Sequence, residues 1–264
     1  MPEGDTVWRT ARHLDQALSG WTLTGSDLRV PAHATVDLSG QPVLETVARG
    51  KHILTRIGDG DAAVTLHTHL KMEGSWHLYR PGSRWRRPAH QARAVLYTEA
   101  WTAVGFSLGI VELLPRADES SVVGHLGPDL LGPDWDEDEA VRRLTADPDR
   151  AIGEALLDQR NLAGVGNMYK SELCFVLGFS PWRPVAQVPD LVKVVRRAKA
   201  VLEANKDRVE QSTTGDLRRG RRLWVYRRDK QACLRCRTPI RVAMQGPSET
   251  GQERATYWCP TCQP

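Results

Sequence analysis

The sequence predicts a two-domain α+β protein, in which a helix and a β-sandwich or barrel come first and a helical domain ending in a metal-binding hairpin follows. Three observations indicate this architecture. Short strand-like segments separated by turn residues fill residues 21–114, helical segments begin near residue 135, and four of the five cysteines lie in the last 32 residues. A chain of 264 residues is long enough to form two such cores.

The first helix is predicted over residues 5–18. Apolar residues recur at helical spacing from Val7 to Leu18, Asp5 can cap the start, and Gly20 is placed to end the helix. Residues 1–4 therefore lie directly before a helix N-terminus, where the partial positive charge of the helix favours nearby anions and disfavours protonation of an amine.

The opening Met1-Pro2-Glu3-Gly4 contains a candidate nucleophile. If Met1 is removed, Pro2 carries the α-nitrogen of the chain as a secondary amine, and Glu3 places a carboxylate beside it. An α-amine titrates near about 8, so a usable fraction is neutral at physiological pH and suited to imine formation with an aldehyde-like sugar carbon. Met-Pro openings are also common processing sites, so the rest of the chain has to support a catalytic Pro2.

The middle of the first half is predicted to be all strand. Turn signals such as Gly58-Asp59-Gly60 and Pro81-Gly82 separate the segments. The eight predicted strands are Trp21–Val30, Val43–Ala48, His52–Ile57, Ala63–His67, Ser75–Tyr79, Ala92–Thr98, Ala103–Ser107 and Ile110–Leu114. Residues 115–134 then carry repeated Pro and Gly and are predicted to be an interdomain linker.

Helices are predicted near 135–146, 149–158, 165–177 and 189–206. The turn at 159–164 joins the second and third into a helix–turn–helix unit whose turn is longer than in the major-groove readers. Gly164-Val165-Gly166-Asn167 opens the later helix, where a close backbone approach and an Asn side chain could seat a phosphate. Glycines at this position also serve tight turns, so this motif is weak by itself.

The cysteines near the C-terminus predict structural zinc. Cys233 and Cys236 form one pair with two residues between them, and Cys259 and Cys262 form another after 22 intervening residues. Two such pairs supply four thiolates for tetrahedral Zn²⁺ with no open catalytic position, and the spacing predicts a hairpin with its tip at 246–251. The fifth, Cys174, is predicted to lie in a helical core.

A second metal at His67 and His69 is disfavoured, because no third ligand lies nearby in the sequence. The expected division of the chain is a catalytic β domain at 1–114, a linker at 115–134, a helical domain at 135–228 and the zinc hairpin at 229–264.

Charge is distributed unevenly along the chain. Residues 129–150 hold eight acids against three arginines, whereas residues 205–241 hold twelve Lys or Arg against four acids, which indicates a polyanion-facing surface. No apolar run approaches the roughly 20 residues that a bilayer requires, and the N-terminus lacks the layout of a signal peptide. We therefore expect a soluble, cytoplasmic protein with no membrane partner.

The four features occur in an order that resembles one family: an N-terminal Met-Pro-Glu-Gly, a β-rich half, a helix–turn–helix with Gly-Val-Gly-Asn, and a four-cysteine hairpin. The chain resembles, over residues 1–264, the formamidopyrimidine-DNA glycosylase and endonuclease VIII family of bacterial base-excision repair. The resemblance implies a β-sandwich, a helix-two-turn-helix domain, and a bifunctional glycosylase and abasic-site lyase that acts on damaged DNA as a monomer, near the nucleoid of a bacterium. One structural Zn²⁺ and no organic cofactor are implied.

The resemblance also implies roles for individual residues. Pro2 matches the nucleophile that attacks C1′ and leaves a Schiff base, and Glu3 matches the acid that assists opening of the sugar ring. Lys51, in Arg-Gly-Lys, matches a hairpin lysine that contacts the phosphate beside the lesion. The remaining matches concern DNA contacts: His69, Asn167 and Arg254 as phosphate ligands, and Met72, in His-Leu-Lys-Met-Glu-Gly, as the apolar wedge inserted into the base stack.

Three departures from the family pattern bear on the substrate. Thr6 stands where many members carry a second glutamate, and residues 101–109 lack the Arg-Arg-Phe-Gly-type element that fills the void opposite the lesion in the purine-directed branch. The segment 212–220 is short and basic where that branch has a base-capping loop. We therefore expect action on oxidised pyrimidines and abasic sites in double-stranded DNA. Whether single-stranded DNA is also a partner is left undecided by the sequence. The alternatives are a purine-directed glycosylase and a non-catalytic paralogue that binds damaged DNA.

Overall fold

The computed structural model describes residues 2–60, 63–247 and 253–264. The chain forms two compact units, residues 1–125 and 126–264. The first unit extends past the last strand, because a 3-10 helix (Arg116–Asp118) and helix α2 (Glu119–Val123) occupy part of the predicted linker. Whether folding domains follow the boundaries expected from the sequence stays a prediction.

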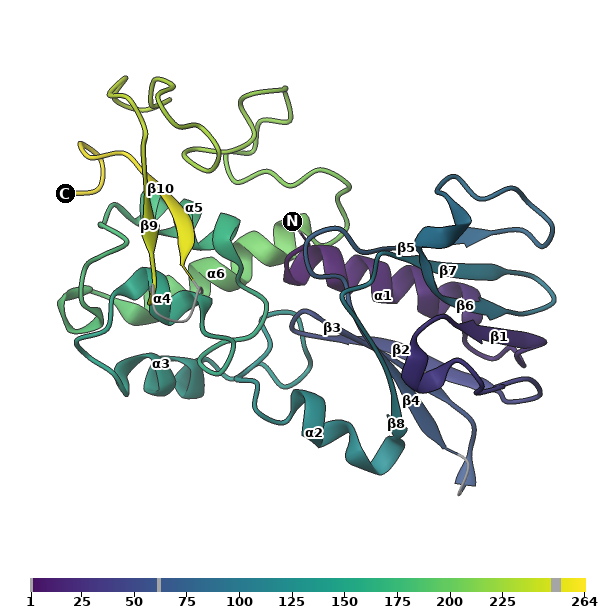
Figure 1. Ribbon diagram of the computed structural model, residues 1–264. Helices are drawn as coiled ribbons and strands as arrows, with labels where there is room; N and C mark the ends of the chain where they lie inside the picture. Colours follow the sequence, from purple (N-terminus) through teal and green to yellow (C-terminus); the bar gives the residue numbers. More distant parts are fainter. Residues whose placement is uncertain (1, 61–62, 248–252) are drawn as a thin grey trace. The chain divides into compact units, whose positions relative to one another are not determined.

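The first unit combines helix α1 (Gly4–Leu18) with two four-stranded antiparallel sheets, as Figure 1 shows. The predicted β-sandwich with an N-terminal helix is thus confirmed. One sheet has the order β1 (Gly25–Leu28), β6 (Ala92–Tyr97), β7 (Thr102–Phe106), β5 (Ser75–Tyr79). The other has the order β2 (Val43–Arg49), β3 (His52–Ile57), β4 (Val64–His69), β8 (Ile110–Pro115).

The core of this unit forms because strand and helix periodicities place apolar side chains on facing surfaces. Val7, Ala11 and Leu14 of α1 are buried in one cluster with residues of both sheets, such as Ile53 and Leu96. Burial of such side chains contributes roughly 1.5–3 kcal/mol each, so α1 is an integral part of the sandwich rather than an appendage.

The first strand is shorter than the predicted Trp21–Val30. The backbone of Trp21 and Leu23 pairs instead with the segment before β2: Val43 N–H donates to the Trp21 carbonyl at 2.8 Å, and Leu23 N–H donates to the Gln41 carbonyl at 2.9 Å. Backbone groups in a compact fold have to find partners, and here the partner is a different segment of the chain. Alternation alone could not reveal that exchange.

The second unit is helical with a terminal hairpin, as predicted. Its helices are α3 (Glu137–Thr145), α4 (Ile152–Leu157), α5 (Asn167–Leu177) and α6 (Leu191–Asn205). Asp136 and Asp190 cap α3 and α6 by accepting from backbone N–H groups, and Gly178 ends α5 in a left-handed conformation with φ 77°. Strands β9 (Arg241–Gln245) and β10 (Arg254–Trp258) form the hairpin. Its predicted tip lies largely outside the described residues.

Helix α5 organises the second unit. It is buried for most of its length, and Cys174 lies in its core cluster as expected. The Lys170 ammonium, also fully buried, donates to Thr256 Oγ1 at 2.5 Å and lies 3.3 Å from Gln245 Oε1, which connects α5 to both hairpin strands. A buried charge needs such partners, so the hairpin strands are held in a fixed place against α5.

Within the described ranges, each helix is too short or too polar to span a membrane.

Candidate functional site

Helix α1 starts at the same end of the sandwich as the turn between β2 and β3. Gly20 N–H donates to the Val43 carbonyl at 2.9 Å, so the C-terminal end of α1 lies beside the start of β2. At about 1.5 Å per helical residue, Glu3 lies roughly 26 Å back along α1. At about 3.3 Å per strand residue, Lys51 lies a similar distance along β2, so the two residues come to the same end. A second hydrogen bond farther along, in which Asp15 Oδ1 accepts from Thr46 N–H at 2.8 Å, keeps α1 and β2 aligned.

The two residues before α1 differ in exposure. Glu3 is wholly buried, and its carbonyl accepts from Val7 N–H at 3.0 Å, which makes it the N-cap residue of α1. Pro2 is partly exposed. A buried carboxylate beside a partly exposed terminal residue suits proton transfer next to a nucleophile. Removal of Met1 stays a prediction, because Met1 lies outside the described residues.

His69 lies at the same end, because the strand register brings it there. It pairs with His52 across β3 and β4, and His52 follows the turn that contains Lys51. The imidazole rings of His52 and His69 meet edge to face with centroids 5.0 Å apart. Lys51 and His69 thus lie at the same end of neighbouring strands, as two ligands of a single phosphate would require.

A chain of partly buried hydrogen bonds, which sequence reasoning missed, begins at His52, the residue that packs against His69. His52 Nδ1 lies 2.8 Å from His67 Nε2, and His67 Nδ1 lies 2.9 Å from Glu112 Oε2. Pairing with His52, rather than metal ligation, explains why His67 is only 2% exposed. Register could have revealed this signal, because His67 lies two residues from His69, the direct partner of His52, and so on the same face of the sheet.

His52 and His69 are neutral at physiological pH. Burial, with help from neighbouring histidines and Lys71, lowers the pKa of His52 to about 3. Burial, followed by the charges of Lys71 and Lys51, lowers the pKa of His69 to about 4. An approaching phosphate would oppose this lowering at His69, since a nearby anion favours the imidazolium.

Met72 stands on a segment with a fixed base and an exposed tip. Leu70 is buried, and Gly74 N–H donates to the Leu70 carbonyl at 2.9 Å, which closes the segment 70–74. Met72 at the tip is 60% exposed, an unusual position for a large apolar side chain. We call residues 70–74 the wedge segment. The role of Met72 as the wedge, which the family resemblance implies, stays a prediction.

In the second unit the hairpin brings Asn167 and Arg254 close together. Asn167 is the first residue of α5, and its Nδ2 donates to the carbonyl of Ala255 at 2.8 Å. Arg254 is exposed and immediately precedes Ala255 on β10. The Asn167 amide nitrogen therefore holds the hairpin, an arrangement that the sequence did not indicate. The helix N-terminus beside an exposed arginine still suits an anion.

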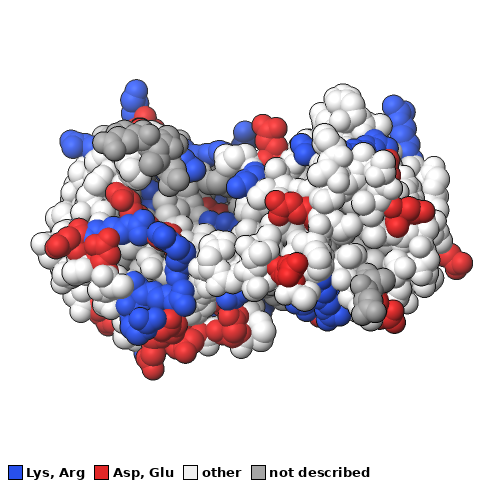
Figure 2. All heavy atoms as spheres, turned by 60° about the horizontal axis from the view of Figure 1, so that its bottom comes forward, with Lys and Arg blue, Asp and Glu red and all other residues white. Residues whose placement is uncertain are grey.

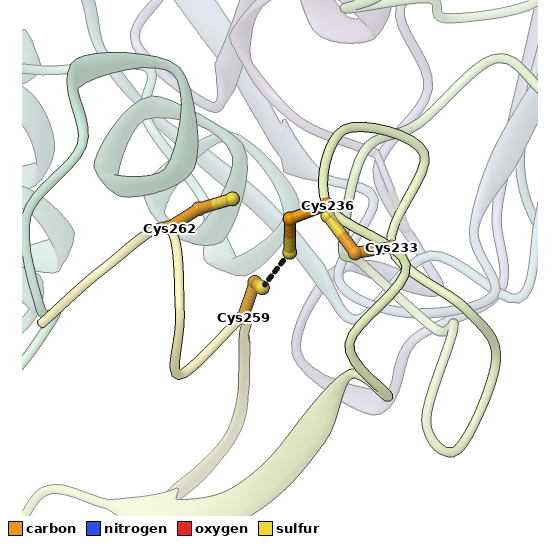
Figure 3. Close-up of side chains that lie close together, drawn as sticks. All are labelled: Cys233, Cys236, Cys259 and Cys262. Atoms are coloured by element: carbon orange, nitrogen blue, oxygen red, sulfur yellow. Dashed lines mark hydrogen bonds between the residues drawn. The ribbon is translucent and has the colours of Figure 1, made fainter.

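The four cysteines of the hairpin converge, as Figure 3 shows. The sulfur atoms of Cys233, Cys236, Cys259 and Cys262 all lie within 4.8 Å of one another, and they are the only candidate metal cluster among the described residues. The two pairs are built alike: Arg237 N–H donates to the Cys233 carbonyl, and Gln263 N–H donates to the Cys259 carbonyl, each at 3.0 Å. This arrangement fits a tetrahedral structural metal.

The basic segment 212–220, also in the second unit, is anchored by a buried acid that sequence reasoning missed. The Glu172 carboxylate of α5, 1% exposed, accepts from the hydroxyl of Thr213 and from the backbone N–H groups of Trp224 and Val225, the latter two at 2.8 Å. Burial raises the pKa of Glu172. Residues 213 and 224, which share this carboxylate, therefore close a loop that contains most of the basic segment.

Several acidic residues of the second unit are paired with arginines. Glu139 accepts from Arg142 and Arg143, and Asp158 accepts from Arg150 and Arg160. Figure 2 likewise shows Lys and Arg beside Asp and Glu on the face that it draws. Within the acidic run of the sequence, Glu137 and Glu139 are thus paired with arginines.

Comparison with known proteins agrees with these features. The family model of the formamidopyrimidine-DNA glycosylase N-terminal domain matches residues 1–107, and that of the formamidopyrimidine-DNA glycosylase H2TH domain matches residues 126–215. A protein named probable endonuclease 8 2 from Streptomyces coelicolor is 56% identical over 100% of this chain and 94% of its own length. The DNA-(apurinic or apyrimidinic site) lyase Nei2 of Mycolicibacterium smegmatis is 49% identical over 100% of this chain and 99% of its own.

Solved structures share the fold. MutM in complex with DNA containing carbocyclic 8-oxo-G superimposes with a TM-score of 0.79 at 21% identity, over 100% of both chains. The Lactococcus lactis Fpg in complex with DNA containing an abasic site has a TM-score of 0.80 at 20% identity, over 99% of both chains.

Proposed function

The chain belongs to the formamidopyrimidine-DNA glycosylase and endonuclease VIII family, and on that premise we propose that it is a DNA glycosylase and abasic-site lyase of base-excision repair that removes oxidised pyrimidines. The observation that supports this most is the common location of Pro2, Glu3, Lys51, His69 and Met72 at one end of the β-sandwich. A nucleophile, an acid, phosphate ligands and an apolar wedge within one surface are what excision of an extruded nucleotide needs.

The chemistry begins at Pro2. Its neutral amine attacks C1′ of the damaged nucleotide, the bond from C1′ to the base breaks, and its electron pair leaves with the base, which takes up a proton. Glu3 protonates the ring oxygen O4′, so the sugar opens and the nitrogen lone pair forms an iminium at C1′. The buried position of Glu3 suits this role, because a carboxyl shielded from water transfers its proton to the nearby sugar rather than to solvent.

Strand cleavage follows from the iminium. The cationic nitrogen acidifies the C2′ proton, whose removal expels the 3′ phosphate, and a second elimination expels the 5′ phosphate. Hydrolysis then returns Pro2 to the free amine. In this proposal Lys51 and His69 hold the phosphate beside the lesion, which keeps C1′ within reach of Pro2.

Unit 2 supplies the remaining DNA contacts in this proposal. Arg254 and the N-terminus of α5 at Asn167 bind the backbone, and the cysteine cluster holds one structural Zn²⁺, which stabilises the hairpin that carries Arg254. Four thiolates leave no open position, so the reaction steps belong to the residues of the first unit.

The preference for pyrimidines is supported by the turn between β7 and β8. This turn has only Ser107, Leu108 and Gly109, and Leu108 is buried with 1% exposure. No long side chain of this turn is available to fill a void opposite a purine lesion or to read its partner base.

Borohydride trapping tests this proposal. Duplexes carrying thymine glycol, 5-hydroxyuracil, 8-oxoguanine opposite cytosine, or an abasic site are incubated with the protein, whose free N-terminus is verified by intact mass, and the covalent adducts are quantified. We expect adducts with the abasic site and both pyrimidine lesions. Predominant trapping on 8-oxoguanine would instead identify a purine-directed enzyme, and DNA binding without any adduct would identify a non-catalytic binder.

A further inference from the structure

The wedge segment requires a rigid support, because an apolar tip can enter a base stack only if its base does not yield. Met72, Lys71 and Glu73 are all exposed, so the support has to come from residues outside the wedge segment. We propose that Arg87, on the loop between β5 and β6, is the positioning residue that fixes the wedge segment and thereby aims Met72. This inference rests on the function proposed above, in which Met72 fills the gap left by an extruded nucleotide.

Arg87 connects three separate segments through its guanidinium. Its Nη1 donates to the carbonyl of Glu73 at 3.3 Å, inside the wedge segment, and to Ser75 Oγ at 3.0 Å, at the start of β5. Its Nη2 donates to Ser107 Oγ at 3.0 Å, in the turn between β7 and β8, and its Nε donates to Gln91 Oε1 at 2.9 Å. All three guanidinium nitrogens thus donate hydrogen bonds. Because the guanidinium is planar and rigid, it fixes the distances among three parts of the chain: residues 73–75, Gln91 and Ser107.

A ring of hydrogen bonds holds Arg87 itself in place. Ser75 Oγ accepts from Arg87 and lies 3.1 Å from His77 Nε2, and His77 Nδ1 lies 3.2 Å from Tyr79 Oη. Tyr79 Oη accepts from Arg86 N–H at 3.0 Å. Because Arg86 directly precedes Arg87, this bond closes the ring. Burial, followed by the charges of Arg87 and Arg86, lowers the pKa of His77, which keeps the ring able to accept from Ser75. Such a closed network leaves the guanidinium little freedom.

The turn that Arg87 contacts also touches the wedge segment directly. Gly109 N–H donates to the His69 carbonyl at 2.9 Å, and a Cβ added at Gly109 would lie only 2.1 Å from Lys71 Cγ. Ser107, the Arg87 partner in this turn, has φ of +48°, a conformation that needs outside support in a residue other than glycine. Arg87 therefore braces the wedge segment both at Glu73 and through the turn that packs against Lys71.

The geometry also explains why lysine would not serve. One ammonium on a flexible stem cannot donate to acceptors on three segments at once, whereas the guanidinium does so in one plane. The Arg87 guanidinium further lies 5.5 Å from the centre of the Phe106 ring, so it is held from one face as well.

Single-turnover kinetics of the full chain on two substrates tests the proposal. In Arg87→Met the aliphatic stem remains and the donors are lost. We expect excision of 5-hydroxyuracil to slow by about 10- to 100-fold, as a misplaced positioning group does. Cleavage at an abasic site, which has no base to unstack, should slow by no more than about threefold. The fluorescence increase of 2-aminopurine placed next to the lesion, which reports unstacking, should be lost in parallel.

Matched variants make the outcome decisive. Arg84→Met removes an exposed arginine from the same loop and should leave both rates within about twofold, as surface changes usually do. Arg87→Lys should fail to rescue excision, and Ser75→Ala, which removes one link of the ring, should reproduce a smaller part of the defect even if Arg87→Met folds poorly.

The sharpest comparison is made in a Met72→Ala background. If Arg87 acts through Met72, Arg87→Met should add no more than about twofold there, because effects of coupled residues are not additive. Full additivity, or equal loss on both substrates with normal 2-aminopurine unstacking, would overturn the proposal. A wild-type protein that forms no adduct at an abasic site would instead refute the proposed function, so the two failures are distinguishable.

Discussion

At the residue scale, the first unit separates groups that carry charge from groups that are kept neutral. The charge of Lys51 helps to lower the pKa of His69, whose imidazole burial holds neutral. His52 is neutral for the same reason and hydrogen-bonds to His67. In the proposed phosphate site, an arriving anion would raise the pKa of His69 again.

The lowered histidine pKa values predict acid-sensitive folding. The folded pKa values of about 3 for His52 and about 4 for His69 lie below the usual value of 6.5, so between these limits the unfolded chain binds more protons. Their stability contribution is complete above about pH 6.5 and is lost as the pH falls through 4 toward 3. We expect the Tm to decrease from pH 6.5 to 5, with a shallower slope in His52→Gln. An equal slope in that variant, with the exposed His90→Gln as control, would contradict this.

A second residue-scale prediction concerns Glu3. Glu3→Gln leaves the Pro2 amine intact but removes the acid that opens the sugar ring. Excision of 5-hydroxyuracil should fall by about 10²- to 10⁴-fold, while an abasic site, whose cyclic hemiacetal opens spontaneously to an aldehyde, should still be trapped by borohydride. The exposed Glu99→Gln, in the turn between β6 and β7, serves as a control for loss of a carboxylate. Equal loss of excision and trapping would show that Glu3 acts in forming the imine instead.

At the scale of elements, periodicity predicted most helices and strands, whereas partners across elements could not be predicted. Strand alternation located His52–Ile57 and Ser75–Tyr79 at their observed bounds. Helix α2 was missed, because Gly and Pro on both sides of it favoured a linker. The Glu172 anchor and the Arg87 brace include contacts between residues 12 and 53 positions apart, which no local pattern encodes.

The candidate site could be predicted only in outline. Family resemblance pointed to His69 and Asn167. It could not show that His52 packs against His69 and hydrogen-bonds to His67, or that the Asn167 amide donates to the Ala255 carbonyl. Hydrogen bonds of this kind are set by register and by helix docking, which follow from the packing of the whole unit.

The hairpin provides the element-scale prediction. Cys233→Ser should reduce bound zinc from about one to near zero per chain, lower the Tm, and weaken binding to DNA with an abasic-site analogue, because the hairpin carries Arg254. Cys174→Ser, which changes a buried cysteine outside the cluster, should leave the zinc content unchanged. Zinc and DNA affinity are measured by atomic absorption and fluorescence anisotropy. Full affinity in the zinc-free variant would exclude the assigned role of the hairpin.

At the scale of the whole molecule, both units contribute cations to one polyanionic partner in this account. Each phosphate neutralised by Lys or Arg releases counterions, so affinity falls as salt rises. Lys51→Met and Arg254→Gln should each weaken DNA binding and lower the slope of log affinity against log salt by about 1. Arg142→Ala removes an arginine that is paired with Glu139 and should leave the slope unchanged. Unchanged slopes in all three variants would mean that DNA binds elsewhere.

If the nitrogen of Pro2 performs the covalent chemistry, the covalent bond to DNA has to form at that atom. After borohydride trapping on abasic DNA, proteolysis and fragmentation mass spectrometry locate the sugar remnant. We expect a single adduct on the N-terminal peptide, at the nitrogen of Pro2, with Met1 absent. An adduct on a lysine such as Lys51, or a trapped chain that still carries Met1, would contradict it.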